Sequence, residues 1–196
     1  LSPPHPELIG KRNPLVKVRN WSVYPAAESL GNGAYLLRAH AHIERPLEEV
    51  FDFFADATNL ERITPPSLRF SIVTPKPIEM RTGTQIDYRL KLNGIPFRWR
   101  TQITEWNPPL KAVTQRWSAS FTDVQIKGPY HTWVHKHQFA AIVDEYAGTS
   151  FTTHMVDEVQ YRLPLWPLGA PALPLVKREL RRIFVHRMRA LNEAFV

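Results

Sequence analysis

The C-terminal segment Pro174–Phe195 constrains the fold most, because its sequence predicts one long amphipathic helix. At about 1.5 Å per residue this helix would be roughly 33 Å long. An apolar stripe of that length needs a large apolar partner, and the alternating segments upstream are the candidate of that size. We therefore expect a curved sheet closed over the helix. The stripe has spacings of three and four and is bordered by basic residues; it contains Val176, Leu180, Ile183, Phe184, Met188, Leu191 and Phe195, and the basic residues include Lys177, Arg178, Arg181, Arg182, Arg187 and Arg189.

Composition favours one globular domain and excludes several kinds of chemistry. The 196 residues are 43% hydrophobic and 22% charged, which is ordinary for a globular chain. Without cysteine there is no disulfide, thiol nucleophile or thiolate metal site. The net charge of +7 favours acidic partners, such as an anionic lipid surface.

No apolar run reaches the roughly 18 residues of a membrane span and no signal peptide is visible, so we expect a cytoplasmic protein, with peripheral membrane contact as an option.

The first 33 residues read as an extension of the domain. They are rich in proline and basic residues and show no sustained periodicity. Trp21, Val23 and Tyr24 are the residues expected to dock this arm onto the domain, which we assign to residues 34–196. The arm is also the candidate site for assembly with another protein.

The remaining segments predict an α+β domain. A strand at 35–43 is followed by two short helices, the first starting after Pro46 and the second covering 57–63. Pro65 and Pro66 end the second helix, because a proline restricts the residue before it. Segments in which apolar and polar residues alternate then predict an antiparallel meander with one buried face. These segments cover 68–73, 84–92, 97–106, 111–117 with a continuation at 121–126, 131–141 and 150–162.

One predicted strand carries histidines on the face that is expected to be buried. The polar residues between them mark the solvent-exposed face. The face expected to be buried therefore carries His131, Trp133, His135, His137 and Phe139. If the following loop is 144–148, residue 143 pairs with 149 and His135 lies opposite Asp157; a slip of two residues would put His137 there instead. In either register a histidine meets a carboxylate inside the sheet.

This cluster has several interpretations. Buried polar groups must find partners, so it fits a structural network. A few polar groups in an apolar cavity also fit ligand recognition. As catalytic residues, His135, His137 and Asp157 would move protons in an aldol-type cyclisation or a dehydration. A metal held by His135 and His137, with Asp157 or His131 as third ligand, is the least favoured interpretation.

Four stretches in this order resemble the helix-grip fold of the START-like (SRPBCC, Bet v 1-like) superfamily, and within it the polyketide cyclase/dehydrase-like ligand-binding proteins. They are ERPLEEVFDFFADATNLERITPPSLRF (44–70), GIPFRWRTQITEWNPP (94–109), DVQIKGPYHTWVHKHQF (123–139) and DEVQYRLPLWPLG (157–169). The resemblance implies a curved antiparallel sheet of about seven strands gripping the C-terminal helix around a cavity for a lipophilic molecule. It implies no metal and no cofactor. The arm and an apparent insert at 113–121 depart from the pattern.

The resemblance and the alternation together give candidate ligand-binding residues. They are Tyr88, Phe97, Trp99, Trp133, His135, His137, Asp157 and Tyr161. Ordinary aromatic packing is the alternative for the aromatic members. The loop before the C-terminal helix, with Leu165, Trp166 and Leu168, is the expected cavity entrance, and an exposed apolar loop beside a basic helix also suits an anionic membrane surface.

Three functions follow as hypotheses. The leading one is a carrier or sensor of a lipid, isoprenoid or polyketide-like molecule. The second is a cyclase or dehydratase that uses the His/Asp cluster, and the third is an accessory subunit of a larger assembly. Nucleic acid is the least favoured partner. The sequence shows no glycine-rich phosphate loop, nucleophile elbow or HExxH motif.

Overall fold

The computed structural model describes residues 18–23, 28–92, 94–109, 118–143 and 150–195, except for the side chains of residues 18–20, 143, 150 and 151. Its helices are α1 (Leu47–Ala55), α2 (Asn59–Arg62) and α3 (Leu173–Ala194), with 3-10 turns at Pro66–Leu68 and Ala170–Ala172. Its strands are β1 (Val18–Val23), β2 (Glu28–Gly31), β3 (Ala34–Ile43), β4 (Ser71–Ile72), β5 (Gln85–Leu92), β6 (Ile95–Asn107), β7 (Ser118–Lys127), β8 (Thr132–Val143) and β9 (Ser150–Arg162).

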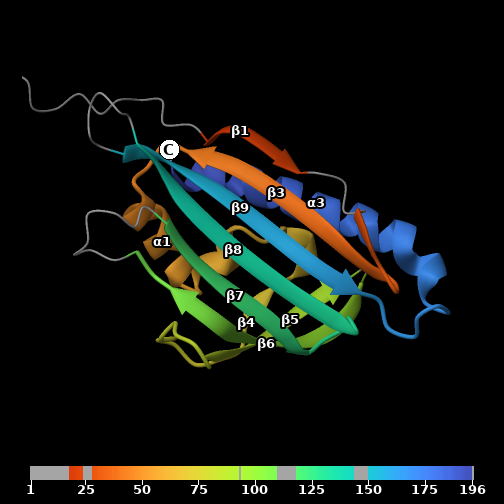
Figure 1. Cartoon of the computed structure of the whole chain (residues 1–196). Coiled ribbons are helices and arrows are strands. Elements are labelled where there is room, and N and C mark those ends of the chain that lie inside the picture. Colours follow the sequence, from red (N-terminus) through yellow and green to blue (C-terminus); the bar gives the residue numbers. More distant parts are fainter. Residues whose placement is uncertain (1–17, 24–27, 93, 110–117, 144–149, 196) are drawn as a thin grey trace, which may run out of the picture.

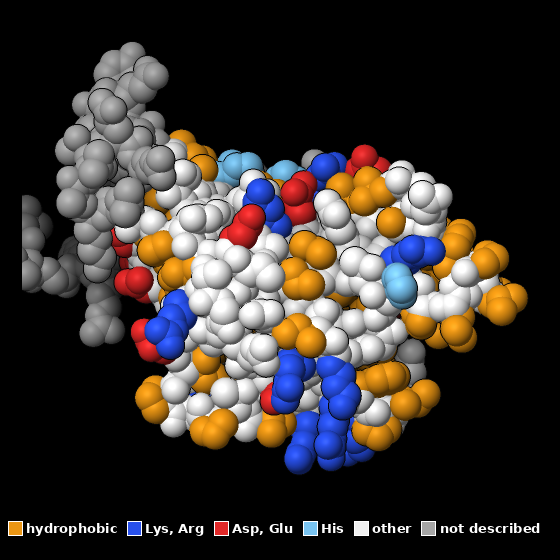
Figure 2. All heavy atoms as spheres, turned by 60° about the horizontal axis from the view of Figure 1, so that its bottom comes forward, with side chains coloured by type: hydrophobic (Ala, Val, Ile, Leu, Met, Phe, Trp, Pro, Cys, Tyr) orange, Lys and Arg blue, Asp and Glu red, His pale blue; other side chains and the backbone are white. Residues whose placement is uncertain are grey.

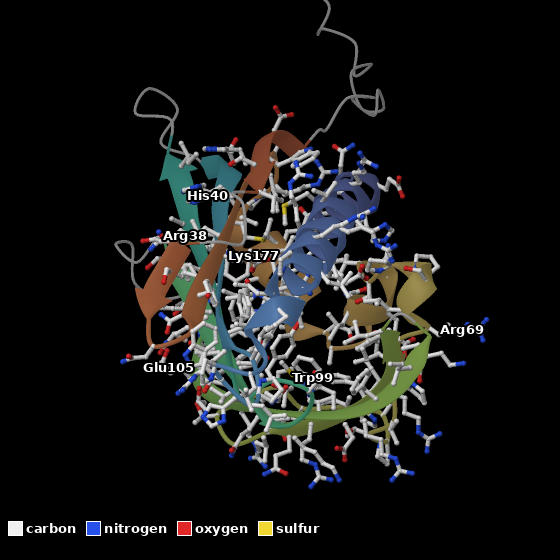
Figure 3. All side chains as sticks on the ribbon, turned by 90° about the vertical axis from the view of Figure 1, so that its right-hand side faces the viewer. Arg38, His40, Arg69, Trp99, Glu105 and Lys177 are labelled. Carbon is white, nitrogen blue, oxygen red and sulfur yellow. The ribbon has the colours of Figure 1, made fainter. Side chains whose placement is uncertain are left out.

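All nine strands belong to one antiparallel sheet that curves around α3 (Figures 1 and 3). The strand order is β1-β3-β9-β8-β7-β6-β5-β4, and β2 pairs with β3 as well. From β5 to β9 each strand pairs with the next one along the chain, so this part is a meander. The helix-grip fold predicted from the sequence is confirmed, with nine strands in place of about seven.

The long helix buries the stripe that the sequence predicts. Leu180, Phe184, Met188 and Leu191 are almost fully buried against the sheet. Removing such side chains from water stabilises the fold by about 1.5–3 kcal/mol each. The helix begins one residue before the predicted start, with Pro174 in its first turn where a missing N–H is harmless.

The two extra strands lie within the range 1–33 that the sequence assigns to an extension. β1 pairs with β3 along Val18–Val23, and Trp21 and Val23 pack against the core as expected. β2 pairs with the beginning of β3. Tyr24 and residues 1–17 lie outside the described residues. The sheet therefore begins before residue 34, and β3 is paired on both of its edges.

Two strand boundaries differ from the prediction. The segment 68–73 forms only the short β4, because the turn that starts at Pro66 includes Leu68 and ends at Arg69, whose φ of 43° is left-handed. A left-handed residue interrupts an extended strand. β7 begins at Ser118, and the predicted strand at 111–117 and most of the apparent insert lie outside the described residues.

Basic residues also concentrate outside α3, on the solvent-exposed face of β5 and β6. Arg89 lies opposite Arg98 there, and Arg100 forms an ion pair with Asp87. A group of Lys and Arg side chains stands out at the lower edge of the surface in Figure 2. These basic residues lie apart from those that border the apolar stripe of the C-terminal helix. Directly opposed like charges such as Arg89 and Arg98 destabilise a sheet slightly.

On the outer face of the sheet, His154 of β9 stacks between His40 and His42 of β3. Its ring centroid lies 5.6 Å from that of His40 and 4.7 Å from that of His42. His40 and His42 thus face outward, and they alternate along β3 with the buried Ala39, Ala41 and Ile43. Partial burial and the two neighbouring imidazoles lower the pKa of His154.

We expect this histidine stack to make stability fall in mild acid. A lowered pKa means that the fold disfavours the protonated ring, so the contribution is complete above the unfolded pKa of about 6.5 and is lost as the pH falls below it. Thermal unfolding should therefore show a lower midpoint at a pH of about 5.5 than at about 7.5. The drop should be smaller in His154→Asn, measured by circular dichroism. An equal drop in this variant would show that the outer stack is not its source.

Candidate functional site

A cavity of about 180 Å³ lies between the concave face of the sheet and α3. Its wall is mostly apolar and aromatic, and Trp99 points into this space (Figure 3). Polar residues line it in two places: Asp56, Asn59 and Thr64 lie in or beside α2, and a larger group is gathered from β6, β7, β8 and α3. Apolar wall residues include Ile86, Tyr88, Trp99, Phe121, Trp133 and Phe184; the gathered polar ones are Thr101, Asp123, His135, His137 and Arg187.

Strand register brings the polar side chains together. His137 lies opposite Asp157 of β9 on one side and Phe121 of β7 on the other. His135 lies opposite Asp123 of β7 and Val159 of β9. The preferred expectation that His135 faces Asp157 across the pair is wrong. Val143 pairs with Ser150 instead of residue 149, and an irregularity between Ile142 and Val143 shifts the pairing by one residue more. The observed register is the two-residue slip that the sequence left open.

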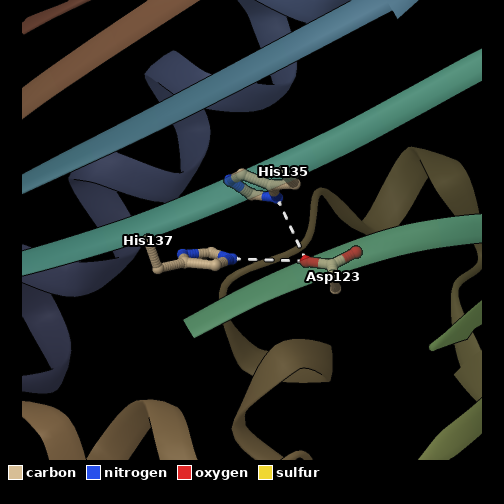
Figure 4. Close-up of side chains that lie close together, drawn as sticks. All are labelled: Asp123, His135 and His137. Atoms are coloured by element: carbon tan, nitrogen blue, oxygen red, sulfur yellow. Dashed lines mark ion pairs between the residues drawn. The ribbon is translucent and has the colours of Figure 1, made fainter. Parts of the chain in front are cut away.

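The four ionisable groups form a closed cluster. Nδ1 of His137 lies 2.6 Å from Oδ1 of Asp157, and Nε2 of the same ring lies 3.5 Å from Oδ2 of Asp123. His135 contacts the same two carboxylates, with Nε2 3.5 Å from Asp157 Oδ1 and Nδ1 3.7 Å from Asp123 Oδ2. Each imidazole thus bridges the two aspartates. Figure 4 shows Asp123 facing both rings.

Asp157 is the most deeply placed member of this His/Asp cluster. Its exposed fraction is 0%, compared with 5% for each histidine, and it does not line the cavity. Neither of its carboxylate oxygens makes a well-aligned hydrogen bond within the described part of the chain, and the same is true of His135 Nε2 and His137 Nδ1. Oδ2 of Asp157 lies 3.5 Å from Nη1 of Arg187. Electrostatic attraction between opposite charges therefore holds these buried side chains together.

The cluster separates the pKa values of the two histidines. Burial and then the neighbouring His137 lower the pKa of His135 to about 4, against the opposing effect of the carboxylates. Burial also acts to lower the pKa of His137, but Asp157 and Asp123 outweigh it and raise that pKa. Despite burial, the histidines hold the pKa of Asp157 well below its usual value and lower that of Asp123. The two carboxylates therefore favour protonation of His137 over that of His135, and the guanidinium of Arg187 adds a positive charge beside Asp157.

Arg187 corrects one expectation from the sequence. It belongs to the set of basic residues expected to surround the apolar stripe, yet it is only 8% exposed and contacts Asp157. The signal was present, since Arg187 follows Leu180 by seven residues and Phe184 by three and so lies on the buried stripe. An arginine inside an apolar stripe indicates a buried carboxylate partner.

Asp123 is the site residue that the sequence analysis missed. Its Oδ1 accepts a hydrogen bond of 2.8 Å from the Thr101 hydroxyl, while Oδ2 faces the histidines. The alternation of β7 could have found it, because Phe121 is buried and a residue two positions along a strand shares its face. His131, in contrast, is exposed and does not reach the cluster.

The other predicted ligand-binding residues divide into two groups. Tyr88, Trp99 and Trp133 line the cavity. Phe97 and Tyr161 do not line it. Tyr161 is buried behind the wall against Tyr35, with 5.8 Å between ring centroids. The alternation therefore identified the correct face of each strand, but not how far along the strand the cavity extends.

The loop expected to form the entrance does not border the cavity. Leu165 and Leu168 are 78% and 83% exposed, so these apolar side chains lie on the surface of the loop. Trp166 instead covers the turn between β2 and β3, where it packs on Tyr35 and lies so close to Gly33 that a side chain there would overlap its ring. The cavity wall includes none of these three loop residues.

A long helix gripped by a curved antiparallel sheet around an internal cavity defines the Bet v 1-like class of ligand-binding folds. A model of the family described as polyketide cyclase / dehydrase and lipid transport matches residues 43–189. The chain belongs to this family, which confirms the START-like resemblance of the sequence. No curated protein matches.

Solved structures support the fold at low identity. A major latex-like protein from Panax ginseng is 12% identical, with a TM-score of 0.50 over 83% of this chain and 98% of the other. A protein from Chromobacterium violaceum is 11% identical, with a TM-score of 0.51 over 81% and 95%. A Thermus thermophilus protein is 15% identical, with a TM-score of 0.50 over 81% and 94%. Among the described residues, no helix has the length and apolar character to cross a membrane.

Proposed function

We propose that the protein binds a small lipophilic molecule in the cavity under α3, as a carrier or sensor. The observation that carries the proposal is a mostly apolar and aromatic cavity wall in which Asp123, His135 and His137 face the space together. Small-molecule sites have this composition, with an apolar wall for affinity and a few polar groups for orientation. The family of the chain includes lipid transport in its description.

The size of the cavity limits what it holds in this conformation. Its 180 Å³ is close to the ~150 Å³ of a cavity that accepts benzene and below the ~300–1,000 Å³ of most ligand sites. The matching ligand is one or two rings with a single polar group. A longer lipid or polyketide would need the helix and sheet to move apart.

Filling the cavity should weaken binding strongly. Ile86 is 2% exposed and lines the wall, so Ile86→Phe adds volume where the ligand lies. We expect the full chain to bind 2-naphthol, followed by calorimetry, and this variant to bind it at least about tenfold more weakly, or about 1.4 kcal/mol. Naphthalene, which lacks the hydroxyl, should bind more weakly than 2-naphthol to the unmodified chain.

The matched control is Ile95→Phe on the neighbouring strand, because Ile95 is 60% exposed and lies outside the cavity wall. It should bind like the unmodified chain. Denaturing extraction and mass spectrometry of the protein from its own source would identify the natural ligand. The proposal fails if no lipophilic compound is extracted or binds, or if Ile86→Phe leaves the binding of 2-naphthol unchanged.

A second candidate is the cyclase or dehydratase activity, which uses the same cavity. The observation in its favour is that both imidazoles line the cavity while Asp157 lies behind them, an arrangement that orients a base toward a substrate. A catalyst would lose turnover of a polyketide-like substrate in His137→Gln while retaining affinity. A carrier would show no turnover to lose.

A further inference from the structure

The two histidines and Asp123 direct one ligand atom each toward a common point. One nitrogen of each imidazole and a carboxylate oxygen of Asp123 lie within 4.8 Å of one another. The rings of the two histidines are close, with 3.8 Å between their centroids. All three residues line the cavity.

The spacing fits a transition-metal ion. Ligand atoms about 2.0–2.1 Å from a tetrahedral zinc ion lie about 3.3–3.4 Å from each other. Oδ2 of Asp123 lies 3.5 Å from His137 Nε2 and 3.7 Å from His135 Nδ1, so these two pairs need shifts of only a few tenths of an ångström. The two imidazoles bring one nitrogen each to within 4.8 Å of the other. Two imidazoles and one carboxylate suit zinc or ferrous iron, whereas magnesium and calcium prefer oxygen ligands alone.

The atoms behind the three ligands have the arrangement that metal centres use. A histidine bound to a metal usually directs its other ring nitrogen at a carboxylate or carbonyl, which fixes the orientation of the ring. Here Asp157 faces the second nitrogen of both rings, at 2.6 Å from His137 Nδ1 and 3.5 Å from His135 Nε2. Arg187 contacts the other oxygen of Asp157, and Thr101 donates to the other oxygen of Asp123.

We propose that Asp123, His135 and His137 bind one divalent transition-metal ion, with Asp157 as the positioning residue for both imidazoles. Three protein ligands leave a fourth position open, and here that position faces the apolar cavity. An oxygen or nitrogen donor of a lipophilic ligand would bind there. This deepens the proposed function, because the ion supplies the anchor for the polar end of the ligand. It also departs from the expectation of no metal that the family resemblance gave.

A metal-free polar network is the competing explanation, and metal content separates the two. We would strip the full chain with a chelator, equilibrate it with micromolar Zn²⁺ and measure bound metal by mass spectrometry. The proposal expects about one ion per chain, as for a single three-ligand site. Co²⁺ in place of Zn²⁺ should give the visible absorption of a tetrahedral nitrogen and oxygen site, and 2-naphthol should change that spectrum.

Matched substitutions locate the ion. Asp123→Asn and His137→Gln should lose it, with folding checked by circular dichroism. Asp87→Asn and His154→Gln should keep it, because these residues lie on the outer face of the sheet. Asp157→Asn should still bind at saturation but about 10–100-fold more weakly, as for other partners of metal-bound histidines.

The result that overturns the inference is a chain that stays free of metal in both the Zn²⁺ and Co²⁺ experiments, or one whose ion is retained by Asp123→Asn and His137→Gln. The two proposals fail separately. Binding of 2-naphthol by the metal-stripped chain with no uptake of Zn²⁺ keeps the lipophilic site and removes the metal. Uptake of Zn²⁺ without binding of any lipophilic compound keeps the metal site and removes the proposed function.

Discussion

Replacing Asp157 with alanine is expected to lower the free energy of unfolding by about 3–5 kcal/mol, because removing one partner from a buried ion pair leaves the other charge uncompensated. Asp157 is fully buried and faces His135, His137 and Arg187 at once. Denaturant unfolding with a chelator present measures the effect without any contribution from bound metal.

The neighbouring residue supplies the control for this substitution. Glu158 points to the opposite face of β9, where it pairs with Arg38 at 2.6 Å and its side chain is 25% exposed. A partly solvated pair of this kind contributes about 0–1 kcal/mol. Glu158→Ala should therefore change stability by at most that amount. Equal losses in the two variants would mean that Asp157 is not the buried centre of charge.

Phe184→Ala in α3 should cost a similar amount, about 3–5 kcal/mol, because it removes a buried aromatic ring and leaves a void. Phe184 is 2% exposed, lies 5.7 Å from the His135 ring between centroids and lines the cavity. The void joins an existing cavity, so the variant should also accept ligands larger than two fused rings. Urea unfolding and calorimetry with a three-ring phenol measure the two effects.

Leu175 is the control on the same helix, since its side chain is 56% exposed. Leu175→Ala should change the unfolding free energy by about 0.5 kcal/mol or less and leave the range of ligands as it was. If Phe184→Ala were destabilised but bound no larger compound, the space under α3 would not be the ligand site.

Much of the fold was predictable because its signals are local. The stripe of α3, the period-two segments and the turns between them each follow from residues close together in the chain. The strands β1 and β2 were missed for the opposite reason. Proline and basic residues dominate the first 33 positions, and only pairing with β3 makes Val18–Val23 and Glu28–Gly31 extended. Tertiary context decides such segments.

Only part of the site could be predicted from the sequence. His135, His137 and Asp157 follow from alternation along β8 and β9, and alternation along β7 could have added Asp123. The register between β8 and β9 could not be counted from the loop. Val143 pairs with Ser150 instead of residue 149, and the irregularity next to Val143 adds the second residue of the slip. Arg187 was overlooked because a basic residue near a basic helix face reads as solvated unless its place on the stripe is checked.

The double pairing of β3 bears on how this protein can be divided. The family match starts at Ile43, the last residue of β3, so a fragment cut to that match would lose β1, β2 and nearly all of β3. A cut at residue 34 would keep β3 but leave its backbone amides and carbonyls unpaired along the side that β1 and β2 cover. Such an open edge is a template for strands of other molecules. The N-terminal strands thus pair the backbone groups of β3 that such a cut would expose.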